Sequence, residues 1–480
     1  MHPLHLFLAS CDAAPDEAIV LQGDIVYSRR DLCTLAGNLT VGLEAHGVNA
    51  ETNARILIVL PNSVDLIALI IATWSLGGLP MLLSPKSTEQ QQTLIEQNHR
   101  PALSVDVKRS SLLKEHKGEI GDIRPTADDD ASVIFTSGST GAPKGVVQTG
   151  STLTSGSTRV AQSLAYRRRE HILVPIPFAH DYGWGQVLSS LVGQHCLVLP
   201  EREILPDVTR AINQHRPSVF AGVPSLYAAL LFGISGFEKA DISSLRIFSA
   251  TGSVFAPKIR TALQDRAPDA KIYSNYGLTE TYRTACLAPS DSTDHDGTVG
   301  KAISGVQIKV MRPNGSDCAI GERGEIVHIG EGVFDRYLDD LENTDKIRTQ
   351  VDSKPAVMTG DIGVLDKYGF LTIVGRQDRL IKSMDIRINL ADIEDAYAML
   401  DGVYSVAVLG TPNLELATVV LTAIVVLETN ANAQHVRRAA NKTLAPHMRA
   451  RQIIVVDELP RTPLGKVDYP ALQTLIPSLT

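Results

Sequence analysis

Cysteine is scarce in this 480-residue chain, and its pattern argues against two common uses of the residue. The five cysteines are an odd number, they are widely scattered, and none belongs to a Cys-x-x-Cys pair. They are Cys11, Cys33, Cys196, Cys286 and Cys318. This usage disfavours a disulfide framework or a zinc site and indicates thiols that fill core or surface positions in a reducing compartment. The N-terminus lacks a basic segment ahead of an apolar one, so we expect no secretory signal and a cytoplasmic location.

An excess of positive charge is also absent, and the one long apolar run is interrupted. With 45 Lys and Arg against 53 Asp and Glu, the net charge of −8 gives no global attraction to nucleic acid or to an anionic membrane, and we expect neither partner. The only dense basic run, Arg167 to Arg169, precedes Glu170 and indicates a solvated helix end. The apolar segment Val64–Leu83 approaches the length of a bilayer span, about 20 residues. Asp65 and the Gly-Gly-Leu-Pro break at 77–80 favour a buried helix followed by a strand.

Short β-rich runs alternate with helix-like stretches over the first three quarters of the chain, as in the run 55–60 and the helical pattern at 64–76. This alternation implies mostly parallel sheets covered on both faces. After about residue 300 short alternating strands and turns indicate antiparallel sheet or barrel. We therefore predict an α/β fold, with a large N-terminal domain (residues 1–375) of mostly parallel βα subdomains plus a β-rich subdomain. A small C-terminal α+β domain (residues 376–480) follows.

The strongest local signal is the glycine-rich stretch Phe135–Gly145, FTSGSTGAPKG, which follows a β-rich run. Its glycines allow close backbone approach, its hydroxyls and amides donate hydrogen bonds, and Lys144 adds a positive charge, so the stretch suits a polyphosphate. The spacing does not fit the Walker pattern, and a flexible Gly/Ser turn is the alternative. The candidate phosphate-binding residues are Thr136, Ser137, Gly138, Ser139, Thr140, Gly141 and Lys144.

This stretch resembles the phosphate-binding motif of the adenylate-forming superfamily, which contains acyl-CoA synthetases, adenylation domains of nonribosomal peptide synthesis and luciferases. Four further segments resemble the family's motifs in the family's order, and the resemblance runs from about residue 10 to the end. They are Asn275–Glu280 (NYGLTE), Thr359–Asp361, the hinge Gly375–Asp378 followed by Ile381 and Lys382, and the lysine loop Pro460–Lys466. The resemblance implies an AMP-forming carboxylate ligase that uses ATP and Mg²⁺, with a small C-terminal domain that pivots at Asp378.

The resemblance also implies roles for these residues that suit their chemistry. An acyl adenylate forms by attack of one anion on another, so the central task is charge neutralisation at the α-phosphate. Glu280 is suited to hold Mg²⁺, Thr279 to donate to the α-phosphate, and Lys466 to reach both reacting groups. Taken singly, the catalytic lysine could be an ordinary surface lysine, and it is the joint order of the motifs that carries the interpretation. The implied nucleotide-binding residues beyond the glycine-rich stretch are Gly252, Ser253, Asn275, Tyr276 and Gly277, with Asp361 and Arg376 at the ribose.

The family's second half-reaction transfers the acyl group to a pantetheine thiol. Here Asp385 occupies a position where the family usually has glycine, and it adds bulk and charge to the implied thiol tunnel. The segment Leu390–Glu394, LADIE, resembles the corresponding segment of carrier-protein-loading adenylation enzymes more than that of CoA ligases. We predict a free-standing enzyme that loads a phosphopantetheinylated carrier protein, as in nonribosomal peptide or polyketide biosynthesis, with coenzyme A as the alternative acceptor.

The stretch 177–183, PFAHDYG, resembles the acyl-pocket segment of aryl-acid adenylating enzymes, with Asp181 in place of an asparagine. A carboxylate in an otherwise apolar pocket calls for a cation, and a substrate ammonium would supply it. We therefore predict a small amino acid, such as a β-amino, cyclic or dicarboxylic one, with an acyl-CoA or aryl-CoA synthetase as the alternative. Arg283 either binds a second substrate carboxylate or pairs with Asp181. The candidate substrate-binding residues are His180, Asp181, Tyr182, Gly185 and Arg283.

Overall fold

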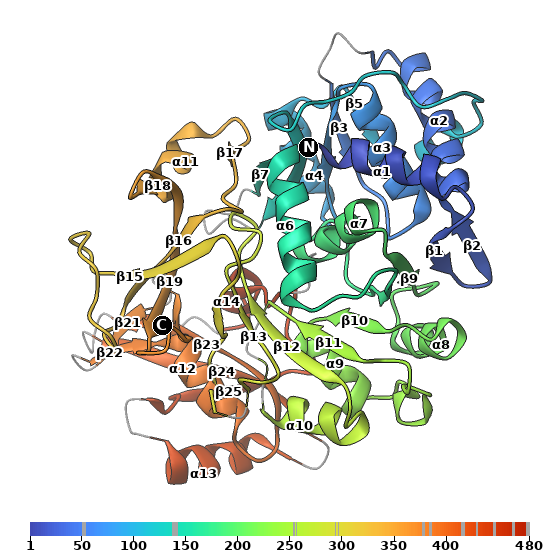
Figure 1. Ribbon diagram of the computed structural model, residues 1–480. Helices are drawn as coiled ribbons and strands as arrows, with labels where there is room; N and C mark the ends of the chain where they lie inside the picture. Colours follow the sequence, from blue (N-terminus) through green and yellow to red (C-terminus); the bar gives the residue numbers. More distant parts are fainter. Residues whose placement is uncertain are drawn as a thin grey trace. The chain divides into compact units, whose positions relative to one another are not determined.

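The computed structural model of the protein (Figure 1) divides into two compact units. The first contains Met1–Ile308, Val327–Met358 and Gly369–Leu371, and the second contains Lys309–Ile326, Thr359–Tyr368 and Thr372–Thr480. The structure describes residues 1–49, 54–136, 143–252, 255, 257–292, 294–295, 297–376, 380–383, 386–413, 418–428, 431–444, 448–462 and 466–476.

One sheet of the first unit has nine strands, and its centre is parallel from β12 through β1. In spatial order the strands are β14 (Lys301–Ala302), β13 (Ala285–Leu287), β12 (Lys271–Tyr276), β11 (Ile247–Ala250), β10 (Val219–Gly222), β8 (His171–Leu173), β9 (Cys196–Leu199), β1 (Ala18–Gln22) and β2 (Ile25–Ser28). The helices between them are α7 (Asp181–Gly193), α8 (Leu205–His215), α9 (Pro224–Phe232), the 3-10 turn η1 (Phe237–Lys239) and α10 (Pro257–Arg266). Strands β9, β10 and β11 are buried throughout, as expected for a parallel sheet covered on both faces.

A second sheet of the same unit has six strands, of which β5, β3, β4 and β6 are parallel. In spatial order they are β17 (Arg336–Tyr337), β7 (Lys144–Thr149), β6 (Asp130–Thr136), β4 (Leu79–Leu82), β3 (Arg55–Ile58) and β5 (Leu103–Val105). The helices of this part are α1 (Pro3–Ala13), α2 (Arg29–Ala45), α3 (Val64–Ser75), α4 (Glu89–His99), α5 (Val107–Leu113) and α6 (Gly150–Ser163). The two sheets confirm the predicted alternation of strands and helices.

The apolar segment 64–83 forms the buried helix α3 followed by the buried strand β4, as predicted from its Gly-Gly-Leu-Pro break. Every residue of α3 except Asp65 is buried. Across the described residues, no helix is both long and apolar enough to cross a membrane.

The basic run Arg167–Arg169 is exposed, as expected, but the predicted helix end is wrong. Helix α6 already ends at Ser163, and Ala165 has a left-handed φ of 51°, so the chain has left the helix before the run begins. The three arginines lie in the connection to β8, where Arg169 pairs with Glu17.

The chain between residues 300 and 376 supplies the β-rich part that the sequence predicts. Strands β15 (Val306–Met311), β16 (Gly324–Gly330), β19 (Lys354–Leu365) and β18 (Arg348–Val351) form a sheet in that order, and β20 (Leu371–Arg376) pairs with β19. Helix α11 (Leu341–Ile347) leads directly into β18.

The C-terminal part of the second unit is the predicted small α+β fold. It contains β21 (Leu380–Ser383), β22 (Ile386–Asn389), α12 (Leu390–Ala398), β23 (Val403–Asn413), β24 (Thr418–Leu427), α13 (Ala433–Thr443), β25 (Gln452–Val455) and α14 (Tyr469–Gln473). Ile393, Tyr397, Val408 and Val436 are fully buried in its core. The division of the chain at residues 375 and 376 stays a prediction.

Candidate active site

The two ends of the expected phosphate-binding stretch are held together by β6 and β7. Thr136 and Lys144 face each other in the antiparallel register, and the Thr136 hydroxyl donates to the Lys144 carbonyl at 3.4 Å. Ser137, Gly138, Ser139, Thr140 and Gly141 lie outside the described residues. The Lys144 ammonium lies 5.0 Å from the centre of the Tyr337 ring, so this cation is positioned by an aromatic face.

Glu280, the expected Mg²⁺ ligand, is positioned by hydrogen bonds from two directions. The Tyr337 hydroxyl donates to Glu280 Oε1 at 2.6 Å, and the Phe334 amide donates to the Glu280 carbonyl at 2.9 Å. The preceding Thr279 is buried, and its carbonyl accepts from Gln148 Nε2 at 3.0 Å. Since Mg²⁺ prefers carboxylate and phosphate oxygens to a cage of protein ligands, a single oriented carboxylate suits a metal brought in with ATP.

Tyr337 is a residue that the sequence analysis missed. It stands on the two-residue strand β17, and no spacing in its neighbourhood separates a site tyrosine from a core one. Only the fold brings it next to both Lys144 and Glu280, which are far from it in the sequence.

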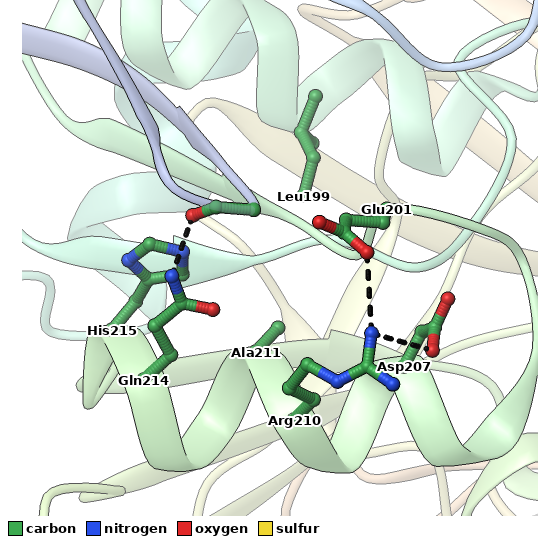
Figure 2. Close-up of a pocket in the computed structure, with 8 residues that line it drawn as sticks. Leu199, Glu201, Asp207, Arg210, Ala211, Gln214 and His215 are labelled. Carbon is green, nitrogen blue, oxygen red and sulfur yellow. Dashed lines mark hydrogen bonds and ion pairs between the residues drawn. The ribbon is translucent and has the colours of Figure 1, made fainter.

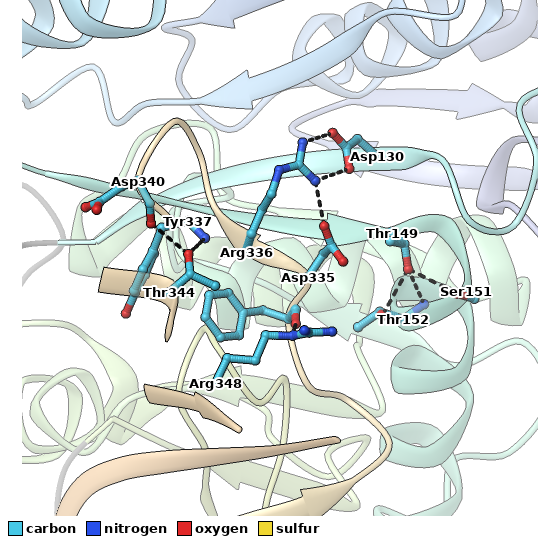
Figure 3. A network of polar contacts seen from close by, with 11 residues as sticks. Asp130, Thr149, Ser151, Thr152, Asp335, Arg336, Tyr337, Asp340, Thr344 and Arg348 are labelled. Carbon is cyan, nitrogen blue, oxygen red and sulfur yellow. Dashed lines mark hydrogen bonds and ion pairs between the residues drawn. The ribbon is translucent and has the colours of Figure 1, made fainter. Parts of the chain in front are cut away.

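A network of ion pairs and hydrogen bonds fixes the segment around Tyr337 (Figure 3). Both nitrogens of the Arg336 fork contact Asp130, at 2.9 and 2.6 Å, and Nη1 also contacts Asp335 at 2.6 Å. The hydrogen bonds to Asp130 are the main cause that raises the pKa of Arg336 above its usual value. The Tyr337 amide donates to Thr344 Oγ1 at 2.9 Å. Arg336 therefore anchors β17 to β6, although β7 lies between these two strands in the sheet.

The candidate adenine-binding residues lie at the carboxyl ends of the parallel strands β11 and β12, where open α/β sheets bind ligands. Asn275 Nδ2 donates to Ser249 Oγ and to the Ala250 carbonyl, each at 3.0 Å, so this amide holds the two strands together. Tyr276 is mostly buried, and Gly277 packs so tightly that an added Cβ would lie 3.0 Å from the Arg283 Cα. Gly252 has a left-handed φ of 94° just after β11, and Ser253 lies outside the described residues.

Asp361 and Arg376, the expected ribose-binding pair, are brought together in the second unit. Arg376 Nη1 lies 3.0 Å from Asp361 Oδ1, and the aspartate is buried while the arginine is half exposed. The Thr359 hydroxyl accepts from the Asp361 amide at 3.1 Å and donates to the Ile326 carbonyl at 2.7 Å. These contacts hold a carboxylate at a defined position within β19, where its oxygens can accept from ribose hydroxyls.

Lys466 is exposed in the second unit, and backbone hydrogen bonds join the described segments 460–462 and 466–468. The Thr462 amide donates to the Lys466 carbonyl at 2.7 Å, and the Asp468 amide donates to the Pro460 carbonyl at 2.8 Å. The following helix α14 is held by its first residue, because the Tyr469 hydroxyl bonds both Glu394 oxygens at 3.0 and 3.1 Å. The hinge residue Asp378 and the expected tunnel residue Asp385 lie outside the described residues.

The candidate acyl-pocket residues begin helix α7. His180 is the N-cap, and its Nδ1 lies 2.6 Å from Asp181 Oδ1. The Tyr182 hydroxyl donates to Ser249, to Oγ at 2.8 Å and to the carbonyl at 2.9 Å, and burial raises the pKa of Tyr182 to about 12. The first turn requires glycine at 183, because an added Cβ would lie 2.1 Å from the Pro177 carbonyl oxygen.

Arg283 lies beside this helix start and is buried, with 5% of its surface exposed. Its guanidinium lies over the Tyr182 ring, 5.3 Å from the ring centre. Its Nη1 atom is buried without a hydrogen-bond partner, and within the described part of the chain no ion pair joins this arginine to a carboxylate. An unpaired buried cationic nitrogen is costly, so its position calls for an anionic or polar ligand.

Tyr282 is a second residue that the sequence analysis missed. Its ring lies against two glycines, since an added Cβ at Gly156 of α6 would meet the ring at 2.8 Å and one at Gly185 of α7 would meet the hydroxyl at 3.6 Å. Helices α6 and α7 lie side by side, and the backbone of Tyr282 has a left-handed φ of 57°. Glycines inside two helical patterns were the available signal in the sequence, and it did not indicate which side chain packs against them.

A surface hollow of the first unit (Figure 2) contains none of the predicted site residues. Its volume is about 10 Å³, enough for a single water molecule, and Arg210 bridges Glu201 and Asp207 across it at 3.2 Å each. Among the described residues there is also no cluster of three or more His, Cys, Asp or Glu that could hold a metal.

Comparison with known proteins identifies the family. The model of the AMP-binding enzyme family matches residues 7–338, and that of the AMP-binding enzyme C-terminal domain matches residues 392–466. The chain is 30% identical over 396 residues to a D-alanine--D-alanyl carrier protein ligase of Listeria monocytogenes, covering 78% of this chain and 76% of the relative. It is 27% identical over 430 residues to a 2-succinylbenzoate--CoA ligase of Bacillus velezensis, covering 86% of each.

Solved structures show the same fold at lower sequence identity. The o-succinylbenzoate CoA synthetase of Bacillus subtilis, solved with its acyl-adenylate intermediate, aligns over 98% of this chain and 97% of its own with a TM-score of 0.87 and 23% identity. The same enzyme has also been solved with ATP and a magnesium ion. An anthranilate CoA ligase solved with anthranoyl-AMP aligns over 99% and 97% of the two chains with a TM-score of 0.86 and 19% identity. The family models together cover most of the chain, which therefore belongs to the AMP-binding enzyme family and is an adenylate-forming carboxylate ligase.

Proposed function

We propose that the protein activates a small amino acid with ATP and Mg²⁺ and transfers the aminoacyl group to the phosphopantetheine thiol of a carrier protein. A carboxylate oxygen of the amino acid attacks the α-phosphorus and pyrophosphate leaves. The thiol sulfur then attacks the carbonyl carbon of the aminoacyl-AMP and AMP leaves. The observation that carries the choice of substrate is the carboxylate of Asp181, placed at the start of α7 beside the buried Tyr182.

The residues of the first unit suit the adenylation step. Glu280, oriented by Tyr337, would hold Mg²⁺ against the phosphate oxygens, and Lys144 adds a positive charge from the end of the phosphate-binding stretch. These groups neutralise charge that would otherwise repel the attacking carboxylate. Lys466 of the second unit is our candidate for contacting both the substrate carboxylate and the α-phosphate, with Asp361 and Arg376 at the ribose.

The recognition of an ammonium would rest on Asp181. Its side chain is 20% exposed, and its contact with His180 keeps one oxygen in place at the N-terminus of α7. A carboxylate near buried aromatic rings attracts a cation more strongly than it would in water. The amino group of a small amino acid supplies that cation in the same molecule as the reacting carboxylate.

Arg283 favours a second candidate among the substrates. Because its Nη1 atom is buried without a partner, the acid could carry a further anionic group that this nitrogen binds. An amino dicarboxylic acid would contact both Asp181 and Arg283, whereas a dicarboxylic acid without an amino group would contact Arg283 alone.

The acceptor is proposed from the LADIE segment at 390–394 and from the relatives. Both acceptor classes occur among them, in the D-alanine carrier protein ligase and the succinylbenzoate CoA ligase. Coenzyme A is thus the alternative acceptor, and incubation of the enzyme with ATP, substrate and either thiol distinguishes them. We expect thioester on the phosphopantetheinylated carrier at a rate at least tenfold that on coenzyme A, and the reverse preference would refute the carrier assignment.

The substrate proposal is tested with Asp181→Asn, which keeps the shape of the side chain and removes its charge. Hydroxamate formation is measured for amino acids and for their deaminated analogues. We expect the variant to lose its preference for the amino acids while its activity with the analogues changes little. Asp65→Asn, at a carboxylate of α3 that pairs with Lys114, is the matched control. An unchanged preference in Asp181→Asn would show that this aspartate does not bind the ammonium of the substrate.

A further inference from the structure

Two thiols lie in direct contact outside the proposed active site. The sulfur atoms of Cys11 and Cys33 are hydrogen-bonded at 2.7 Å. Cys11 is near the C-terminal end of α1 and Cys33 is near the start of α2. A disulfide bond requires a separation of about 2.05 Å, so a relative shift of less than about 1 Å would bring these sulfurs to bonding distance.

Packing holds both cysteines in this arrangement. Cys11 is buried in the main hydrophobic core, Cys33 packs against the same core, and Cys11 Sγ also lies 3.7 Å from the Arg29 carbonyl oxygen. The start of α2 is fixed by a capping box between Ser28 and Asp31. Helices α1 and α2 contact each other, as Figure 1 shows at the N-terminal end of the chain. The two thiols therefore stay close without any movement of the helices.

The remaining cysteines have different surroundings. Cys196 and Cys318 direct their thiols at backbone carbonyl oxygens, at 3.9 and 3.6 Å. Burial raises the pKa of Cys196 to about 12 and that of Cys286 to about 11, which disfavours their reactive thiolate forms. Within the pair, Cys33 donates its hydrogen bond to Cys11 and is the more exposed thiol, so Cys33 is the one that an oxidant in solution can reach. The contact with Cys33 and burial raise the pKa of Cys11.

We propose that Cys11 and Cys33 form a reversible disulfide that links α1 to α2, with a low-molecular-weight disulfide of the glutathione type as the oxidant. The Cys33 thiolate attacks one sulfur of the oxidant and expels one thiolate, which leaves a mixed disulfide on Cys33. Cys11 then attacks the Cys33 sulfur and expels the second thiolate, and the proton of Cys11 passes to a released small thiolate. In total the two protein thiols are oxidised to one disulfide, and the oxidant is reduced to two small thiols.

All five cysteines are free thiols in the structure, as expected, and the proposed bond would give two of them a role beyond filling space. The sequence pattern argues against a framework of several disulfides, and one reversible bond is compatible with a chain that is otherwise reduced. The bond would close a loop between residues that are 22 positions apart, which restricts the unfolded chain and stabilises the oxidised protein.

The test equilibrates the folded, full-length protein with defined ratios of reduced and oxidised glutathione, followed by acid quenching, alkylation and mass spectrometry. We expect the loss of two hydrogen atoms, a linked peptide pair containing Cys11 and Cys33, and a melting temperature that rises on oxidation and falls again with dithiothreitol. Cys318→Ser is the matched control and retains all three results. Cys11→Ser accumulates a glutathione adduct at Cys33, because the resolving thiol is missing, and Cys33→Ser forms neither the adduct nor the link.

The proposal fails if Cys11 and Cys33 remain open to alkylation at every glutathione ratio, or if their link forms only after the chain has been unfolded in urea. It also fails if oxidation instead joins Cys318 of two molecules. If either serine variant does not fold, the peptide map and the melting temperature of the unaltered protein decide the question alone.

Discussion

Replacement of Tyr337 by phenylalanine removes one hydroxyl and keeps the ring, so it isolates the hydrogen bond to Glu280. That bond is 2.6 Å long, Tyr337 is buried and Glu280 is half-buried. A hydrogen bond to a charged group contributes about 1.5–3 kcal/mol, and we take the lower end because water can reach the freed carboxylate oxygen. At about 1.36 kcal/mol for each factor of ten, the expected loss is about tenfold.

This loss should appear in a specific parameter. If Tyr337 orients a metal-binding carboxylate, the concentration of Mg²⁺ needed for half-maximal pyrophosphate release should rise about tenfold in Tyr337→Phe, in line with the effect of removing partners of metal ligands. At saturating Mg²⁺, the rate of pyrophosphate release by the variant should return close to that of the unaltered protein. Tyr368→Phe, at an exposed tyrosine, is the matched control. An unchanged Mg²⁺ dependence in a variant that melts at the normal temperature would refute the role of Tyr337.

The other predictions concern the site and the stability of the fold. Glu280→Gln should lower pyrophosphate release at least a hundredfold while the melting temperature stays within a few degrees, because the variant keeps the shape of the side chain and loses its charge; near-normal release would contradict the metal role. Gly156→Ala places a Cβ 2.8 Å from the Tyr282 ring and should destabilise the protein by about 1–3 kcal/mol in urea unfolding, and no change would show that the ring moves freely. Burial lowers the pKa of His328 to about 4, below its unfolded value of about 6.5, so the folded protein disfavours the charged form. The contribution of neutral His328 to the free energy of unfolding is therefore complete above pH 6.5 and is lost as the pH falls toward 4. In His328→Gln, the free energy of unfolding measured in urea should depend less on pH in that window.

Much of the fold could be predicted from the sequence because its strands and helices carry strong local patterns. The mostly apolar run of α3 ends at a Gly-Gly break, and β9, β10 and β11 are short apolar runs between turn residues. The arginine run at 167–169 shows the limit of this reasoning, since the end of α6 at Ser163 is set by a left-handed residue that carries no glycine signal.

The candidate site was predictable where its residues belong to ordered motifs and unpredictable where the fold alone assembles it. Asp361 and Arg376 come together as the motifs imply, 15 residues apart and at 3.0 Å. Tyr337 reaches Glu280 across 57 positions, and Tyr282 fits between two glycines of separate helices. The contact between Cys11 and Cys33 likewise depends on how two helices pack, which composition and spacing do not contain.

The central claim is that the enzyme adenylates a small amino acid, and ATP–pyrophosphate exchange measures that step without any thiol acceptor. The assay compares amino acids, including β-amino, cyclic and dicarboxylic ones, with their deaminated analogues and with fatty and aryl acids. We predict that exchange is at least tenfold faster with one of the amino acids than with its deaminated analogue. Fast exchange with fatty or aryl acids and none with amino acids would contradict the claim.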